Sequence, residues 1–186
     1  MNFTAHYGSP LGSITLASDG ANLTGLWFDG QKHYAATLED EVLENHNLSV
    51  FAETRRWLDL YFAGKRPDFT PPIAPTGTPF RQRVWKILLD IPYGKTITYG
   101  EIAKRTVETF HEKSLQSTHM SPQAVGGAVG HNPISIIIPC HRVVGSNGSL
   151  TGYAGGLERK ERLLQLERYE IPVTVMSGRR NTSSVL

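Results

Sequence analysis

The chain has 186 residues, of which 39% are hydrophobic, a length that suits one large domain or two small ones, each with a modest core. The formal net charge of +2 is compatible with a nucleic-acid partner but far from the strongly basic balance that would require one. The sequence has no apolar run of transmembrane length, no apolar signal-peptide core, and a single cysteine that cannot form an intrachain disulfide. These features predict a cytoplasmic protein without membrane contact.

Three short segments near the amino terminus are rich in β-branched and aromatic residues, as strands are: 2–7, 12–18 and 23–28. The stretches that separate them, GSPLG and SDGAN, have the Gly, Pro, Asp and Asn content of tight turns. This pattern predicts a three-stranded antiparallel meander.

Residues 49–64 place apolar side chains at helical spacing: Val50, Trp57, Leu58, Tyr61 and Phe62. Ser49 is the candidate amino-terminal cap of this helix, and Gly64 is its candidate stop. A helix with one apolar face at this position is expected to cover the sheet.

A proline-rich stretch, 65–77, follows the helix. Proline is unfavourable in helix interiors and central strands, so the stretch is interpreted as a linker between two units. We therefore expect an amino-terminal domain over residues 1–72, a carboxyl-terminal domain over 73–175 and a mobile tail over 176–186.

The second unit contains recognisable helix starts. Thr78 and Pro79 suit an N-cap and a first helical position, and apolar residues follow at helical spacing. Thr98 and Glu101 form a capping-box pattern at the head of a helix that is predicted to run to about Arg105.

A further start, Ser121 followed by Pro122, opens the segment PQAVGGAVG. A polar stretch connects this helix to the preceding one. Two helices joined in this way predict a helix-turn-helix motif.

The PQAVGGAVG helix has unusually small side chains. Gly126 and Gly127 each cost about 1 kcal/mol relative to alanine in a helix interior, so some other interaction must compensate. Gln123, Ala124 and Ala128 also leave little bulk that would hold the helix away from a groove. Tight helix packing and contact with nucleic acid both fit these residues, and the residues alone leave the choice open.

The single cysteine, Cys140, is directly followed by His141. A thiol attacks as a thiolate and needs a neighbour that lowers its pKa or accepts its proton, which an imidazole can do. Adjacent residues of an extended strand point to opposite faces, so a Cys-His pair requires a turn here or a bridging water. The acid that would orient the imidazole is left open among Glu158, Glu161 and Glu167.

A metal site is the competing interpretation of this region. Its candidate ligands are His111, His119, His131, Cys140 and His141. None of their spacings matches a zinc pattern, and the chain has no second cysteine, so no metal is predicted.

The segment PCHRVVGSNGSLTGYAGG, residues 139–156, resembles the active-site signature of the O6-alkylguanine-DNA alkyltransferases, also called methylated-DNA-protein-cysteine methyltransferases. The resemblance extends through TPFRQRVWKILLDIPYGKTITYGEIA, AVGGAVGHNPISIIIPCHRV and GGLERKERLL, and more loosely through SPLGSITLASDGANLTGLWF and LDLYFAGKRPDF. It implies an α/β (α+β) fold. A ribonuclease-H-like domain, with an antiparallel sheet and a helix, would precede a winged-helix-like domain whose helix-turn-helix enters the minor groove of DNA.

The same resemblance implies direct-reversal DNA repair. The damaged guanine of double-stranded DNA is flipped out of the stack, and the cysteine irreversibly takes the alkyl group from O6, or in some cases from O4 of alkylthymine. The protein would act once, as a monomer and without a cofactor.

Specific roles follow from the resemblance. Cys140 corresponds to the nucleophile and alkyl acceptor, His141 to the water-mediated base, and Glu167 to the carboxylate that orients the base. Asn132 corresponds to the hinge asparagine between recognition helix and active site. Tyr99 corresponds to the tyrosine that crowds the phosphate of the flipped nucleotide and donates to the leaving guanine.

The guanine pocket is expected to be lined by backbone groups of Cys140 and Val143 and by the loop around Tyr153 and Ala154. The residues expected to contact DNA are Gln123, Ala124, Gly126, Gly127, Ala128 and Tyr99.

The chain departs from the usual family pattern at Gln123 and in the length of one segment. Gln123 stands where the usual pattern has an arginine at the start of the recognition helix, filling the gap left by the flipped base. The segment between Tyr99 and Gln123 is about ten residues longer than the common form, and its polar composition indicates a loop. Ala154 also stands where some relatives carry serine, so its contact would have to come from the backbone.

Two other classes of function are weighed. A lesion-binding protein without chemistry would share the fold, but such relatives replace the reactive cysteine, which is present here. A Cys-His hydrolase would share the dyad, but it would turn over many times, and adjacent Cys and His are unusual for it.

Overall fold

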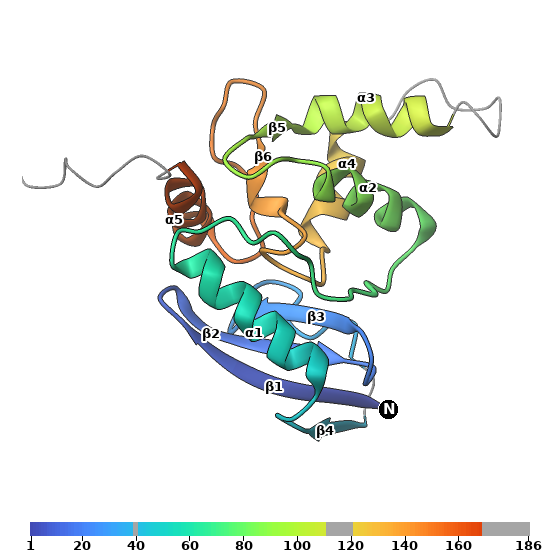
Figure 1. Ribbon diagram of the computed structural model, residues 1–186. Coiled ribbons are helices and arrows are strands. Elements are labelled where there is room, and N and C mark those ends of the chain that lie inside the picture. The colour runs from blue at the N-terminus through green and yellow to red at the C-terminus, as the bar shows by residue number, and fades with distance from the viewer. Residues whose placement is uncertain (39–40, 111–120, 169–186) are drawn as a thin grey trace, which may run out of the picture.

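The computed structural model describes residues 1–38, 41–110 and 121–168. Figure 1 shows two units in contact, a sheet covered by one helix and a mainly helical unit that contains the carboxyl-terminal half of the chain. The residues 111–120 of the predicted long loop and the predicted tail, 176–186, lie outside the described residues.

The amino-terminal sheet has four strands: β1 (Asn2–Ser9), β2 (Gly12–Ser18), β3 (Leu23–Phe28) and β4 (Val42–Glu44). The strand order is β3-β2-β1-β4; β1, β2 and β3 pair antiparallel, which confirms the predicted meander. The sequence did not indicate β4, which pairs parallel with β1. It has three residues, all exposed, and therefore no alternation of apolar and polar side chains.

One helix, α1 (Ser49–Phe62), covers the sheet and buries the predicted apolar face, including Val50, Leu58 and Tyr61. The prediction of Ser49 as its cap is wrong. Ser49 is the first helical residue, Leu48 occupies the N-cap position, and no side chain caps the helix. Gly64 does end the helix, because its φ of 73° is left-handed and its N–H bonds the carbonyl of Tyr61.

The proline-rich stretch is partly built into the sheet. The N–H of Leu23 donates to the carbonyl of Pro72 at 2.8 Å, and the N–H of Ala74 donates to Leu23 at 2.9 Å. Further along β3, Leu26 forms a bridge with Ile134 of the second unit. The outer edge of β3 is therefore paired at both positions, which joins the two units and protects an otherwise open edge.

The second unit contains α2 (Pro79–Leu89), β5 (Ile97–Thr98), α3 (Tyr99–Phe110), α4 (Pro122–Gly130), β6 (Val143–Val144) and α5 (Leu157–Arg168). The predicted caps are confirmed: the hydroxyls of Thr78 and Ser121 accept from the N–H groups of Arg81 and Ala124. The Thr98 and Glu101 capping box is also confirmed by reciprocal hydrogen bonds.

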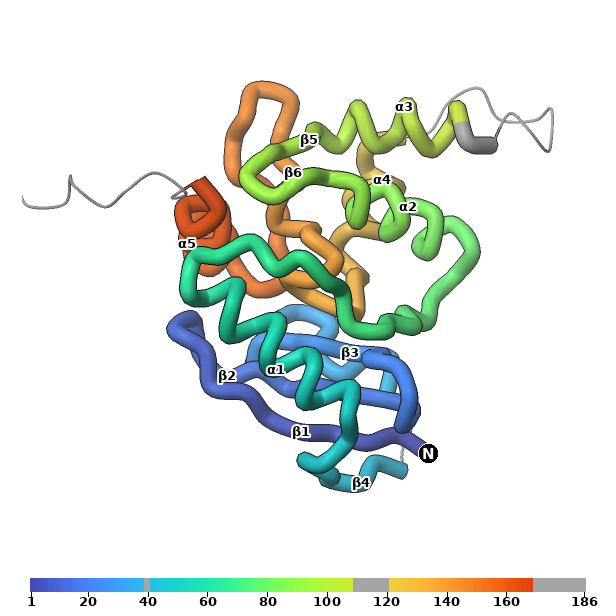
Figure 2. The backbone as a smooth tube through the Cα atoms, in the orientation of Figure 1, coloured from blue at the N-terminus to red at the C-terminus, as the bar shows by residue number. Residues whose placement is uncertain are grey.

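The helix α3 was predicted to end near Arg105. This prediction is wrong, because α3 continues to Phe110. The helices α2, α3 and α4 contact one another, as the predicted helix-turn-helix requires, and the tube in Figure 2 follows their path. The indole of Trp85 on α2 donates to the carbonyl of Ala128 on α4 at 2.9 Å.

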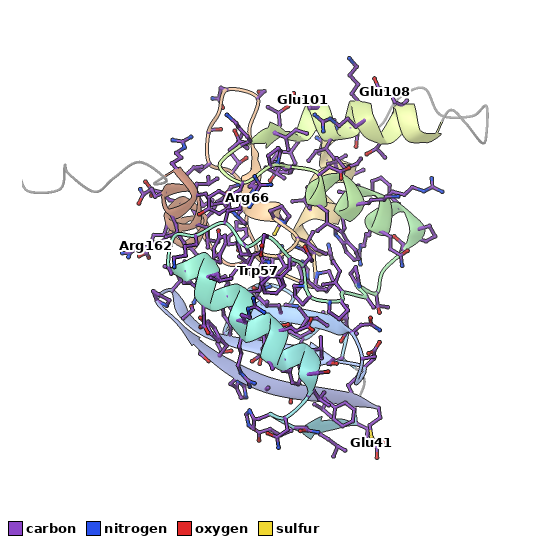
Figure 3. All side chains as sticks on the ribbon, in the orientation of Figure 1. Glu41, Trp57, Arg66, Glu101, Glu108 and Arg162 are labelled. Carbon is purple, nitrogen blue, oxygen red and sulfur yellow. The ribbon has the colours of Figure 1, made fainter. Side chains whose placement is uncertain are left out.

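Pairing of β5 with β6 is the step that brings distant parts of the second unit together. Ile97 lies opposite Val143, and Thr98 lies opposite Val144. This pairing places the start of α3, with Tyr99, beside the segment that follows Cys140. Side chains fill the space between α1 and the second unit, with Trp57 among them (Figure 3). None of the helices in the described part of the chain has the length and apolar character needed to span a membrane.

Candidate active site

The backbone before Cys140 makes two tight reversals. Ile136 has a φ of 69°, which is strained for a β-branched residue, and around it the N–H of Ile137 bonds the carbonyl of Ser135 at 2.8 Å. At Pro139, with φ −82° and ψ 63°, the N–H of Cys140 bonds the carbonyl of Ile138 at 2.8 Å. A 3-10 turn over Cys140–Arg142 follows, so the chain turns at the Cys-His pair, which is one of the two arrangements expected there, the other being a bridging water.

The thiol of Cys140 is 3% exposed and is held by Asn132. The Asn132 amide donates to Sγ at 3.1 Å and to the carbonyl of Ile138 at 2.8 Å, while its oxygen accepts from the N–H of Ile134. Burial raises the pKa of the Cys140 thiol, while the Asn132 hydrogen bond and the charge of Lys160 oppose this rise. Asn132 follows the end of α4, so the position of the thiol is tied to the end of that helix.

His141 is completely buried and contacts a carboxylate. Its Nε2 lies 2.6 Å from Oε1 of Glu167, whose side chain is also fully buried. Burial lowers the pKa of His141 despite the opposing effect of Glu167, so the ring is neutral at pH 7. A neutral ring that donates from Nε2 carries its lone pair on Nδ1, and no described protein group bonds that atom.

Glu167 is the acceptor at the centre of this site. Arg142 donates to both carboxylate oxygens, from Nε at 2.8 Å and from Nη2 at 3.0 Å, and the N–H of Gly94 donates to Oε2 at 3.1 Å. The hydroxyl of Tyr61 donates to Oε1 at 2.8 Å. Burial alone would raise the pKa of the Glu167 carboxyl, but His141 and Arg142 outweigh it and hold that pKa well below its ordinary value.

Of the three glutamates left open by the sequence, only Glu167 reaches His141. Glu158 and Glu161 are exposed on α5, and Glu158 pairs with Arg162, which points outward in Figure 3. The structure therefore places Cys140, His141, Asn132 and Glu167 together.

Lys160 is a site residue that the sequence reasoning missed. It is fully buried, and its Nζ donates to the carbonyls of Val143, Thr151 and Gly152. Burial lowers its pKa to about 8, against an opposing effect of Cys140. A signal was available, because Lys160 and Glu167 flank the buried Leu163 and Leu164 on one face of α5.

Tyr99 lies across the loop that contains Thr151, Gly152 and Tyr153, called here the active-site loop. Its hydroxyl is 3.2 Å from the carbonyls of both Thr151 and Gly152, the same carbonyls that Lys160 holds. A methyl group at Gly126 of α4 would lie 3.9 Å from the ring of Tyr99, so the ring stands against α4. Burial, and then the neighbouring Cys140, raise the pKa of Tyr99, which stays a hydrogen-bond donor at neutral pH.

The predicted pocket residues surround the same loop. The ring of Tyr153 stands edge-on to His141 with centroids 6.5 Å apart, and its hydroxyl is buried without a described partner. The carbonyl of Ala154 accepts from the N–H of Lys32 in the amino-terminal unit at 2.9 Å. The carbonyl of Val143 is bound by Lys160, and its N–H is bound by the carbonyl of Cys140.

Apart from Tyr99, the predicted DNA-contacting residues lie on α4 and divide between two faces of that helix. Gln123, Ala124 and Gly127 are exposed, and Gly126 is half-buried. Ala128, which was also predicted to contact DNA, is only 2% exposed, and its carbonyl accepts from the indole of Trp85 on α2.

The candidate metal ligands are not gathered at one place in the described structure. His111 and His119 lie outside the described residues. His131 stacks on His33 with centroids 3.9 Å apart and bonds the carbonyl of Gly127. Within residues 1–38, 41–110 and 121–168, no group of three or more His, Cys, Asp or Glu side chains is placed to hold a metal ion.

Two further features of this region escaped the sequence reasoning. Arg142 directly follows the Cys-His pair, so its place beside the dyad was visible in the sequence. Tyr61 lies on the buried face of α1 at ordinary helical spacing, and no local signal distinguishes it from a core tyrosine.

Comparison with known proteins places this geometry in a family. Residues 3–75 match the ribonuclease-like domain of 6-O-methylguanine DNA methyltransferase, and residues 79–169 match the DNA binding domain of the same family. A relative from Methanosarcina acetivorans, named methylated-DNA-protein-cysteine methyltransferase, is 45% identical over 166 residues, which are 89% of this chain and 97% of the relative.

Solved structures agree with this assignment. The O6-methylguanine methyltransferase of Mycobacterium tuberculosis is 40% identical, with a TM-score of 0.77 over 94% of this chain and 97% of that chain. A structure of the Mycobacterium tuberculosis protein OGT in complex with DNA is 41% identical, with a TM-score of 0.76 over 92% and 95% of the two chains. From its two matched domains, its identity to these relatives and its fold, the chain belongs to the 6-O-methylguanine DNA methyltransferase family.

Proposed function

We propose that this protein repairs double-stranded DNA by moving the alkyl group of O6-alkylguanine irreversibly onto Cys140. The observation that supports this role most directly is the buried thiol, which Asn132 holds beside a neutral histidine whose Nε2 is committed to Glu167. We further propose that the protein works as a monomer in the reducing cytoplasm, where a thiol persists.

The reaction first requires that the thiol loses its proton. One water between Sγ and Nδ1 of His141 passes that proton to the imidazole, and Glu167 stabilises the imidazolium that forms. The thiolate that remains is stabilised by the amide of Asn132 and by the nearby charge of Lys160. The resting thiol is therefore protonated, and it ionises as the reaction proceeds.

The transfer itself is a displacement at saturated carbon. The bond from Sγ to the alkyl carbon forms while the bond from that carbon to O6 breaks, and the electron pair goes to the guanine ring. The proton held by His141 returns through solvent to the guanine. A thioether has no easy hydrolytic path, so each molecule reacts once.

Tyr99 is placed to assist the leaving guanine. Its hydroxyl remains protonated and turns from the carbonyls of Thr151 and Gly152 to donate to the base as negative charge develops there. Those two carbonyls stay satisfied during this rotation, because Lys160 continues to bind both of them.

DNA is expected to meet the exposed face of α4, where Gln123, Ala124 and Gly127 lie. Because Asn132 connects the end of this helix to Cys140, docking of the helix would place a flipped base beside the thiol. We also propose that the boundary between the two domains lies between residues 72 and 73.

The proposed function is tested by the intact mass of the protein after incubation with a duplex that contains O6-methylguanine. We expect each molecule to gain one methyl group, located on Cys140 by peptide mapping, and repair to stop when the protein is consumed. Removal of more methyl groups than there are protein molecules would contradict the proposal and favour a turnover enzyme.

Gln123 is expected to hold the extruded state open by occupying the vacated stack. That task exists only in duplex DNA, so Gln123→Ala should slow repair of a duplex lesion by about tenfold while sparing reaction with free O6-benzylguanine. The measurement compares single-turnover rates of the two substrates.

Gln123→Arg is the matched variant for this experiment. A guanidinium both stacks and meets phosphates, so this variant should repair the duplex at least as fast as the wild type. Equal slowing of both substrates by Gln123→Ala would mean instead that the residue shapes the pocket or the fold.

A further inference from the structure

A tyrosine of the amino-terminal unit reaches into the active site of the other unit. Tyr61 lies on α1, and its hydroxyl donates to Oε1 of Glu167 at 2.8 Å and lies 3.4 Å from Nε2 of His141. Figure 1 shows the carboxyl end of α1 next to α5, which carries Glu167. The amino-terminal unit therefore contacts the proton-accepting group directly.

The position of this hydroxyl is fixed by packing. Tyr61 is fully buried, its ring stacks on Trp57 with centroids 5.2 Å apart, and the edges of Phe62 and Tyr93 complete the surrounding aromatic cluster. A ring enclosed in this way has little freedom to move its hydroxyl away from the carboxylate.

The hydroxyl acts as a donor at every pH of interest. Burial, followed by the charge of Glu167, raises the pKa of Tyr61 well above its ordinary value, so the proton stays on the phenol. Oε1 of Glu167 thus accepts from Tyr61, from His141 and from Arg142. Donors on one oxygen share its negative charge, and each one weakens the pull of that oxygen on the others.

We propose that Tyr61 is a positioning residue for alkyl transfer: its hydroxyl holds the Glu167 carboxylate and shares its charge, which keeps His141 in the neutral form that accepts a proton. This inference rests on the proposed function. It assigns to the amino-terminal unit a part in the chemistry, in addition to its packing.

The groups around His141 determine the direction of the expected effect. The charged and titratable groups that face it are Glu167 and Lys160 from α5, Arg142 and Cys140 from its own turn, Tyr153 from the active-site loop and Tyr61 from α1. Among these groups only Glu167 favours the imidazolium strongly. Removing a donor from Glu167 leaves more negative charge for His141 and therefore raises the pKa of His141.

The test is the pH dependence of single-turnover alkyl transfer in Tyr61→Phe, measured with O6-benzylguanine so that DNA binding does not enter. Transfer requires neutral His141, so the rate falls as pH drops through the pKa of that residue. In Tyr61→Phe this acidic limb should move to higher pH by about one unit. On the limb the rate of the variant should therefore be about tenfold below that of the wild type, and this difference should disappear as the pH rises above the limb.

The control is Tyr7→Phe. It also removes a tyrosine hydroxyl that donates to a carboxylate, but this carboxylate is Asp59 of α1, 2.9 Å from the hydroxyl and outside the site. Its pH profile should match the wild type. Tyr61→Phe keeps the aromatic ring, and its thermal unfolding is compared with that of Tyr7→Phe to show that both variants are folded.

Two outcomes would overturn the inference: an acidic limb at the wild-type pH, or a loss of rate that is the same at every pH, as a purely structural effect would give. Failure of the proposed function is distinguishable, because the wild-type protein would then not acquire a benzyl group on Cys140 at any pH.

Discussion

Cys140→Ala is expected to abolish alkyl transfer to the protein while leaving affinity for duplex DNA almost unchanged. The thiol provides the chemistry, whereas affinity for DNA comes mainly from contacts with phosphates. The fold should tolerate the change, because the Asn132 amide that bonds Sγ also donates to the carbonyls of Ile134 and Ile138. The amide therefore keeps protein partners when the sulfur is removed.

The measurement pairs intact mass after incubation with O6-methylguanine duplex and equilibrium binding to the same duplex at one fixed salt concentration. Loss of transfer with binding retained supports Cys140 as the acceptor. Loss of both together would indicate that the cysteine supports the structure of the DNA-binding unit, and residual methylation of the variant would place the acceptor elsewhere.

Glu167→Gln is expected to have the second large effect, on both stability and rate. The substitution leaves the guanidinium of Arg142, whose side chain is 10% exposed, without its charged partner. Breaking a buried pair in this way costs about 3–5 kcal/mol of the free energy of unfolding. The rate of transfer should fall as well, since His141 loses the charge that stabilises its protonated form, and the apparent pKa of Cys140 should rise.

The pH dependence of stability gives an independent check. The pKa of Glu167 is below its ordinary value of 4.5 in the folded protein, so this carboxylate stabilises the fold above about pH 4.5. That contribution is lost as the pH falls through the folded pKa. Acid unfolding of the wild type should therefore be steeper below pH 4.5 than acid unfolding of Glu167→Gln.

Glu158→Gln is the matched control, because it removes a carboxylate from the same helix. Glu158 forms an exposed pair with Arg162 at 3.5 Å, and such pairs contribute at most about 0.5 kcal/mol. Denaturant unfolding and single-turnover rates measured on both variants separate the two effects. Similar behaviour of the two variants would show that Glu167 is only a helix-end carboxylate.

The sequence by itself determined the local features of this protein. The starts of α2, α3 and α4 were predictable from Thr78, the Thr98 capping box and Ser121, respectively, because a cap bonds N–H groups within three residues of itself. The signature around Cys140 also identified the family, since it combines many positions in one short segment.

Tertiary structure decided how the site is completed. The residue pattern left Glu158, Glu161 and Glu167 open and only the family resemblance named Glu167; the physical reason for Glu167 is how α5 is rotated against the turn at His141, a contact between residues 26 apart. The part of Tyr61 depends on a contact that spans 106 residues and joins two units. The burial of Ala128 likewise depends on the face of α4 that meets α2. Such contacts form only when separate elements pack. Helical spacing marks Glu167 as a residue of the buried face of α5, but it does not name the partner.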